Sequence, residues 1–108
     1  MILIINTSGK DLEFVLGDKY KSVVVEKQSV ALPAQCEKFI AECGATWRDI
    51  SAIGIVVGPG SFTGIRLGIA YAKGLGLGLN IPVVGPKGNS GIIKLAKQAA
   101  AKKVNLTA

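Results

Sequence analysis

The sequence predicts a single α/β domain built on a mixed sheet. Three short apolar runs near the start are joined by polar turns, which indicates antiparallel strands. Two later apolar runs alternate with segments of helical periodicity, an order typical of parallel strands with helices packed on them. The length of 108 residues suits one domain with one core. The expected order is three strands, then helix, strand, helix, strand and helix.

The first three strands are marked by apolar runs that end at turn residues. They span Ile2–Asn6, Leu12–Leu16 and Tyr20–Val25. The turns between them, Ser8–Asp11 and Gly17–Lys19, combine glycine with aspartate, which is typical of tight connections between neighbouring strands. We therefore expect an antiparallel meander.

An amphipathic helix is expected from about Val30 to Cys43. Its apolar residues recur with helical spacing on one face: Leu32, Cys36, Phe39, Ile40 and Cys43. Pro33 is expected in the first turn and Gly44 at the end. Cys36 and Cys43 lie about two turns apart, too far for a disulfide, so we expect two buried thiols.

The next elements are a buried strand and a helix rich in glycine. A connection at Trp47–Asp49 leads into Ile50–Val57, an uninterrupted apolar run of the kind found in inner parallel strands. The turn Gly58-Pro59-Gly60 follows, and Ser61 is placed to cap the helix. Asn80 is expected to end it.

The last part of the chain is predicted to hold the strand Ile81–Val84, a loop over 85–91 and a basic helix over 92–103. Every acidic residue lies at or before Asp49, so the remainder carries only positive charge, chiefly on Lys87, Lys94, Lys97, Lys102 and Lys103. Such lysines contact phosphates of a nucleic acid, form the solvated face of a terminal helix, or belong to a frayed chain end.

The glycine-rich helix carries two rows of small residues at i, i+4 spacing. One row is Gly64, Gly68, Ala72 and Gly76, and the other is Ala70, Gly74 and Gly78. Because each interior glycine costs about 1 kcal/mol relative to alanine, the rows indicate close packing. The packing is either against the chain's own sheet or against a helix of a partner protein.

Of these two interpretations we predict the partner contact. Its interface is expected to comprise Gly64, Arg66, Gly68, Ala72, Lys73, Gly74 and Gly76, with Arg66 and Lys73 on one polar strip. Leucine at Gly68 or Gly74 would then abolish binding and leave the fold intact.

Two turns are candidates for binding phosphate. Asn6-Thr7-Ser8 follows the first strand and precedes Gly9, so its backbone N–H groups could face an anion. An aspartate there would hold a magnesium-bound water, but Asn6 is neutral, which favours a structural turn and a degenerate phosphate loop. The second candidate is an anion turn at Gly58, Gly60 and Ser61, where a helix begins. Its spacing matches neither the P-loop nor the dinucleotide fingerprint.

The side chains needed for catalysis are not gathered anywhere in the sequence. Histidine, the commonest general base, does not occur, and the carboxylates are spread over turns and exposed helix positions. We expect no catalytic residue and no metal site, and a binding module is favoured over an enzyme. The polar residues after Met1–Ile5, together with Arg66 and Lys73 in the most apolar stretch, lead us to expect a cytoplasmic protein without a membrane span.

Three segments together resemble the bacterial TsaB (YeaZ) family. They are Ile2–Ser8, the block Gly58–Arg66, and the continuation from Ala72 through Gly85. The resemblance covers residues 1–85 and implies a half-domain of the actin-like ATPase fold, related to Hsp70, sugar kinases and ribonuclease H. We expect one such domain over 1–108, in which 86–108 is an unmatched basic helix and the family's second domain is absent.

The resemblance also implies a function. Members of that family are non-catalytic subunits that support TsaD in making threonylcarbamoyladenosine at position 37 of tRNA, with a TsaE-like ATPase in the complex. It implies ATP and metal on partner subunits, none on this chain, tRNA reached through the complex, and a homodimer when the chain is alone. The family's partner contact is made by helices of this domain.

Two departures from the family pattern bear on function. Asn6 stands where members usually have aspartate, and Gln28-Ser29 where they often have His-Ser. Two alternatives therefore stay open: a residual nucleotide-binding or phosphotransfer protein of the actin-like superfamily, and a self-associating module.

Overall fold

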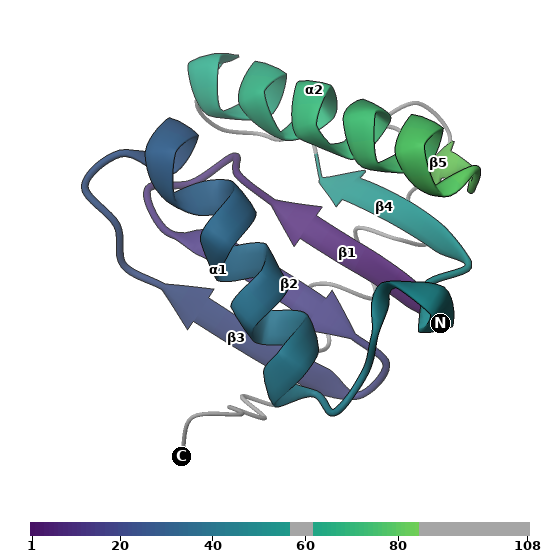
Figure 1. Cartoon of the computed structure of the whole chain (residues 1–108). Coiled ribbons are helices and arrows are strands. Elements are labelled where there is room, and N and C mark those ends of the chain that lie inside the picture. Colours follow the sequence, from purple (N-terminus) through teal and green to yellow (C-terminus); the bar gives the residue numbers. More distant parts are fainter. Residues whose placement is uncertain (57–61, 85–108) are drawn as a thin grey trace.

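The computed structural model describes residues 1–56 and 62–84, which form one sheet and two long helices (Figure 1). The elements in chain order are β1 (Ile2–Asn6), β2 (Leu12–Leu16), β3 (Lys19–Val23), α1 (Gln28–Glu42), the 3-10 turn η1 (Trp47–Asp49), β4 (Ala52–Val56), α2 (Phe62–Leu79) and β5 (Val83–Val84). The predicted loop and helix after Val84 and the turn at 58–61 lie outside the described residues.

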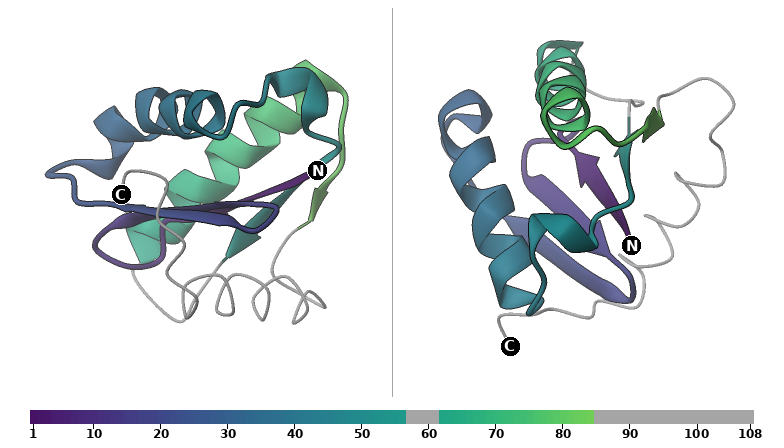
Figure 2. Two further views of the ribbon diagram at one scale, coloured as in Figure 1. Left: turned by 90° about the horizontal axis from the view of Figure 1, so that it is seen from below. Right: turned by 45° about the vertical axis from the view of Figure 1, so that its right-hand side comes forward.

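The sheet is mixed, as the sequence predicts. Its strand order is β3-β2-β1-β4-β5, with β2 antiparallel to β1 and β3 and β4 parallel to β1 and β5. Both helices cover the same face of the sheet, which Figure 2 shows edge-on. In this arrangement α1 packs chiefly on β2, and α2 packs chiefly on β4.

The core lies between the sheet and the two helices. Alternate residues of the strands point to this side, so Leu3 and Ile5 of β1 meet the apolar face of α1. The rings of Phe14 and Phe39 stack with their centroids 5.5 Å apart and join β2 to α1. Ile4, Val15 and Val56 form a separate buried cluster.

Helix α1 begins at Gln28, earlier than predicted, because the carbonyl of Lys27 already accepts hydrogen bonds from Val30 N and Ala31 N. Pro33 therefore lies inside the helix, and its expected place in the first turn is wrong. The end is as predicted: Gly44 has a φ of +71°, and its N–H bonds to Ala41 O. This conformation is easy for glycine and closes the helix.

The two cysteines are free, and only one is buried as expected. Cys36 lies in the core, where burial raises the pKa of its thiol to about 12. Cys43 caps the C-terminus of α1 and is half-buried. The prediction of two buried thiols is therefore right for Cys36 and wrong for Cys43.

The bounds of β3 differ from the predicted ones because its pairing with β2 sets them. β3 starts at Lys19 and stops at Val23 because these residues pair with Leu16 and Leu12, the two ends of β2. On this edge strand, Lys21 points inward and forms a nearly buried ion pair with Glu42, with Nζ and Oε1 2.5 Å apart. Asn80 has a φ of 56° and ends α2 as predicted.

One row of small residues on α2 faces the chain's own sheet. Gly64, Gly68, Ala72 and Gly76 are all buried. A Cβ added at Gly68 would lie 2.7 Å from Ile55 Cδ1 and closer still to Thr7 Oγ1, and one at Gly76 would lie 3.0 Å from Ile81 O. These four predicted interface residues therefore contact the sheet and not a partner, and leucine at Gly68 would not leave the fold intact.

The second row lies on the opposite side of α2. Ala70, Gly74 and Gly78 are exposed, and a Cβ at Gly74 or Gly78 would meet nothing within 4 Å.

Neither described helix has the length and hydropathy needed to cross a membrane.

Replacing glycine by alanine is expected to change the free energy of unfolding in opposite directions in the two rows. In Gly64→Ala the new methyl group meets the backbone carbonyl of Thr7, which cannot rotate away. We therefore expect the free energy of unfolding to fall by about 1–3 kcal/mol. Gly78→Ala adds helix propensity without a clash and should stabilise by up to about 1 kcal/mol. Urea denaturation measures both, and equal effects at the two positions would contradict this assignment of the rows.

Candidate functional site

The turn after β1 is closed by its own side chains. Asn6 Oδ1 accepts hydrogen bonds from Ser8 N at 3.0 Å and Ser8 Oγ at 2.6 Å. Asn6 Nδ2 donates to Glu13 Oε1 at 2.9 Å. The Ser8 N–H that a phosphate would need is therefore already bonded, which favours the interpretation of Asn6-Thr7-Ser8 as a structural turn.

Thr7 ties this turn to α2. Its side chain is fully buried, and its Oγ1 donates to Gly64 O at 2.5 Å. Thr7 is thus a packing residue at the start of the glycine-rich helix.

Glu13 is held by donors on both of its carboxylate oxygens. Asn6 Nδ2 donates to one and Tyr20 OH to the other. Burial, together with the hydrogen bond to Glu13, raises the pKa of Tyr20 to about 12. Tyr20 therefore stays protonated at neutral pH and remains a donor.

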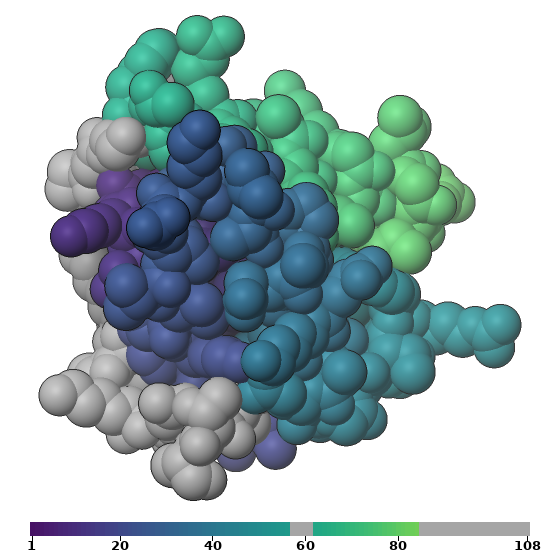
Figure 3. Space-filling view, turned by 60° about the vertical axis from the view of Figure 1, so that its left-hand side comes forward, coloured from purple at the N-terminus to yellow at the C-terminus, as the bar shows by residue number. Residues whose placement is uncertain are grey.

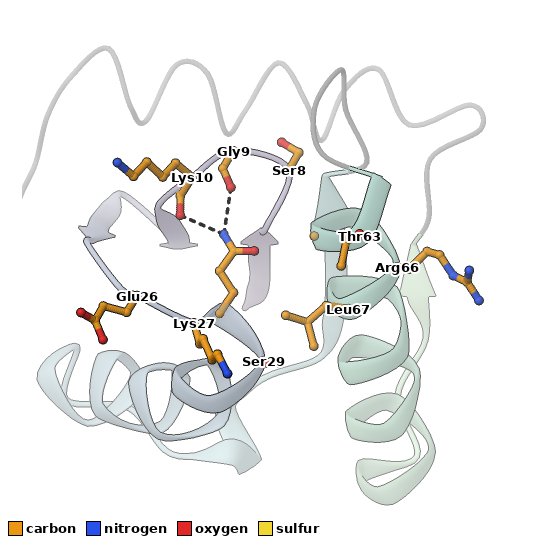
Figure 4. A pocket seen from close by; sticks show the side chains of 11 residues that line it. Ser8, Gly9, Lys10, Glu26, Lys27, Ser29, Thr63, Arg66 and Leu67 are labelled. Carbon is orange, nitrogen blue, oxygen red and sulfur yellow. Dashed lines mark hydrogen bonds between the residues drawn. The ribbon is translucent and has the colours of Figure 1, made fainter.

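A cleft of about 900 Å³ lies where the β1–β2 turn meets the N-terminal ends of α1 and α2. Its lining includes Ser8, Thr63 and the cationic residues Lys10, Lys27 and Arg66. Figure 4 shows the side chains of Lys10 and Arg66 extending away from the cleft. The carbonyls of Gly9 and Lys10 are bonded to Gln28 Nε2. The described lining thus lacks converging cations.

The anion turn at Gly58, Gly60 and Ser61 lies outside the described residues. Within 1–56 and 62–84, no three His, Cys, Asp or Glu side chains gather closely enough to hold a metal ion.

The solvent side of α2 carries small residues beside exposed large ones. We call this the outer α2 surface, formed by Phe62, Arg66, Ala70, Lys73, Gly74, Leu77 and Gly78, all exposed. Phe62 is 72% exposed and Leu77 is 87% exposed, and the Arg66 guanidinium lies 5.5 Å from the Phe62 ring centre. Of the predicted interface residues, Arg66, Lys73 and Gly74 lie on it.

A groove of about 410 Å³ continues this surface toward α1. Figure 3 shows α1 and α2 side by side on this face of the molecule. The groove is lined by Pro33, Glu37, Trp47, Tyr71, Gly74, Leu75, Gly78 and Leu79. Sequence reasoning missed the aromatic members, although Tyr71, Leu75 and Leu79 follow i, i+4 spacing next to the exposed glycines.

The fold of this chain is also found in a solved protein structure. YeaZ from Pseudomonas aeruginosa superposes with a TM-score of 0.68 at 23% identity, over 93% of this chain and 49% of that one. The mixed sheet with both helices on one face is a half-domain of the actin-like ATPase fold, as predicted.

The family follows from the sequence comparisons. A family model described as TsaD, tRNA N6-adenosine threonylcarbamoyltransferase, matches residues 22–103, and the chain belongs to this family. TsaB of Escherichia coli K12 is 43% identical over 49 residues, which are 45% of this chain and 21% of that protein. TsaB of Bacillus subtilis 168 is 32% identical over 65 residues, 60% of this chain and 28% of that protein. The predicted resemblance to TsaB (YeaZ) is confirmed.

Relatives named for the transferase itself also match. The tRNA N6-adenosine threonylcarbamoyltransferase of Jannaschia sp. CCS1 is 32% identical over 79 residues, 73% of this chain and 22% of that protein. The chain thus spans between a fifth and just over a quarter of the length of these curated relatives.

The closed turn predicts a pH-dependent effect of Asn6→Asp. The substitution removes the donor to Glu13 and places two carboxylates side by side, so the pKa of the pair rises in the folded state. We expect a loss of about 1–3 kcal/mol near pH 7.5. The loss shrinks relative to the wild type as the pH falls and the pair takes up a proton.

Urea denaturation at several pH values measures this loss. Asn6→Ala serves as the control, because it also loses the bond to Glu13, together with the two bonds from Ser8, and adds no charge. Its loss of stability should therefore be similar at every pH. A pH-independent loss in Asn6→Asp would contradict the proximity of the two side chains.

Proposed function

We propose that this chain is a non-catalytic binding subunit that supports a TsaD-type protein in the threonylcarbamoyladenosine modification of tRNA position 37. The names of its relatives support the pathway, since they are a tRNA threonylcarbamoyladenosine biosynthesis protein and a tRNA N6-adenosine threonylcarbamoyltransferase. The closed turn at Asn6 supports a subunit that leaves ATP and metal chemistry to its partners.

The observation that carries the proposal is the outer α2 surface. Two large apolar side chains, Phe62 and Leu77, stand exposed near its ends. The exposed small residues Ala70 and Gly74 lie between them, and Gly78 follows Leu77. Exposed apolar surface of this kind marks interaction sites. At the open positions Gly74 and Gly78, the lack of a side chain also lets a second helix approach to the short end of the usual 8–10 Å range.

The charge of the outer α2 surface indicates which residue types a partner helix carries. Arg66 and Lys73 are the charged residues of the outer α2 surface, and both are positive. Complementary charge favours the correct encounter. The partner helix therefore carries small or apolar residues facing Gly74 and Gly78 and acidic residues beside them.

The same surface accounts for the other proposed partners. A second copy of the chain could pair through it, so a homodimer forms when the chain is alone and competes with the TsaD-type partner. A TsaE-like ATPase and tRNA then meet this chain only within the assembled complex.

The test is binding of a purified TsaD-type protein to variants of the outer α2 surface. Gly74→Leu and Gly78→Leu place bulk where a partner helix would lie, so we expect affinity to fall at least about tenfold. The free energy of unfolding should not fall, because both positions are open. Gly78→Ala and Ser22→Leu, the latter exposed on β3 away from α2, should bind like the wild type.

Unchanged binding of both leucine variants would show that the outer α2 surface is not the interface. Calorimetry with ATP and magnesium addresses the competing nucleotide-binding function. Tight binding that depends on Asn6 or Ser8 would favour that function over the one proposed.

A further inference from the structure

One side chain of α1 reaches across to the β1–β2 turn and to α2. Gln28 Nε2 donates to Gly9 O at 2.9 Å and Lys10 O at 3.2 Å, and lies 3.5 Å from Asp11 O. The dashed lines in Figure 4 mark the first two bonds. Three backbone carbonyls of one turn thus converge on a single amide nitrogen.

The other end of the same amide faces α2. A Cβ at Gly64 would lie 3.1 Å from Gln28 Oε1 and closer still to Thr7 O. Thr7 in turn donates to Gly64 O. Gln28, Thr7, Gly9, Lys10 and Gly64 therefore form one contact point, which we call the Gln28 junction.

The Gln28 junction holds the N-terminal ends of both helices to one turn. Beyond the junction, α1 rests chiefly on β2 and α2 chiefly on β4, and the two helices also contact each other directly, where Tyr71 of α2 meets Cys36 of α1. The groove between them has Pro33 and Glu37 of α1 on one side and Tyr71 and Gly74 of α2 on the other. The width of that groove therefore depends on how the helices are held relative to each other.

We propose that Gln28 is a positioning residue for partner binding: through the Gln28 junction it fixes α1 against α2 and so sets the shape of the groove beside the outer α2 surface. This inference rests on the proposed function. Gln28 itself lies at the far end of α1 from Trp47 and does not line the groove. Its effect on the partner is transmitted by the two helices.

The test uses two substitutions that differ in donor chemistry. Gln28→Ala removes the donor, and we expect the affinity for a TsaD-type protein to fall about fivefold to tenfold at every pH. Gln28→Glu places a carboxylate against the carbonyls, so binding should be weak near pH 7.5. It should recover toward about pH 5, where protonation restores an O–H donor. Urea denaturation of Gln28→Glu at both pH values is measured alongside, because weak binding near pH 7.5 by protein that is still folded separates positioning from a loss of stability.

Ser29→Ala is the matched control, because Ser29 is the next residue, exposed at the same end of α1. It should bind like the wild type. Hydrogen exchange of the free protein gives a readout that needs no partner: Gln28→Ala should exchange faster in the turn after β1 and in the first turns of α1 and α2.

The outcomes separate the two proposals. If the wild type does not bind a TsaD-type protein, the proposed function fails. If the wild type binds and Gln28→Ala binds equally well, or Gln28→Glu shows no recovery at low pH, the positioning role alone is overturned. Unchanged hydrogen exchange in Gln28→Ala would also overturn it, since the junction would then not hold the helices.

Discussion

The arrangement of the whole molecule depends on how closely α2 lies on the sheet. At Gly64 and Gly68 the helix backbone is so near Thr7 and Ile55 that no Cβ fits. This short distance lets Thr7 Oγ1 reach a helix carbonyl. It also brings α2 near enough for Gln28 of α1 to meet it. Because glycine weakens an isolated helix, the stability of α2 comes from this contact.

The two rows of small residues on α2 therefore serve different physical purposes. The inner row removes side chains so that helix and sheet pack without a gap. The outer row removes side chains where nothing in the described structure packs, beside Leu77 and the groove next to α1. Only the outer row is available to another protein. The turn at Asn6 differs from this outer row, because its polar groups are already hydrogen-bonded within the fold.

Local patterns predicted β1 and β2 to the residue because apolar runs and turns bound them. β3 and the start of α1 differed because strand pairing and the Lys27 carbonyl decide them, and neither is visible locally. Helical spacing found both small rows, but glycine carries no hydropathy that tells an inner row from an outer one. The groove residues Pro33, Trp47 and Tyr71 come together only in three dimensions.

The inward position of Lys21 has a consequence for how copies of this chain meet. β3 is an edge of the sheet, and an uncovered strand edge invites another strand to pair with it. The ammonium group of Lys21 is engaged by Glu42 beneath this edge, and inward charges of this kind are one means by which natural sheets resist edge-to-edge aggregation. Lys21 thus makes this strand edge an unfavourable place for a strand of a second copy to pair.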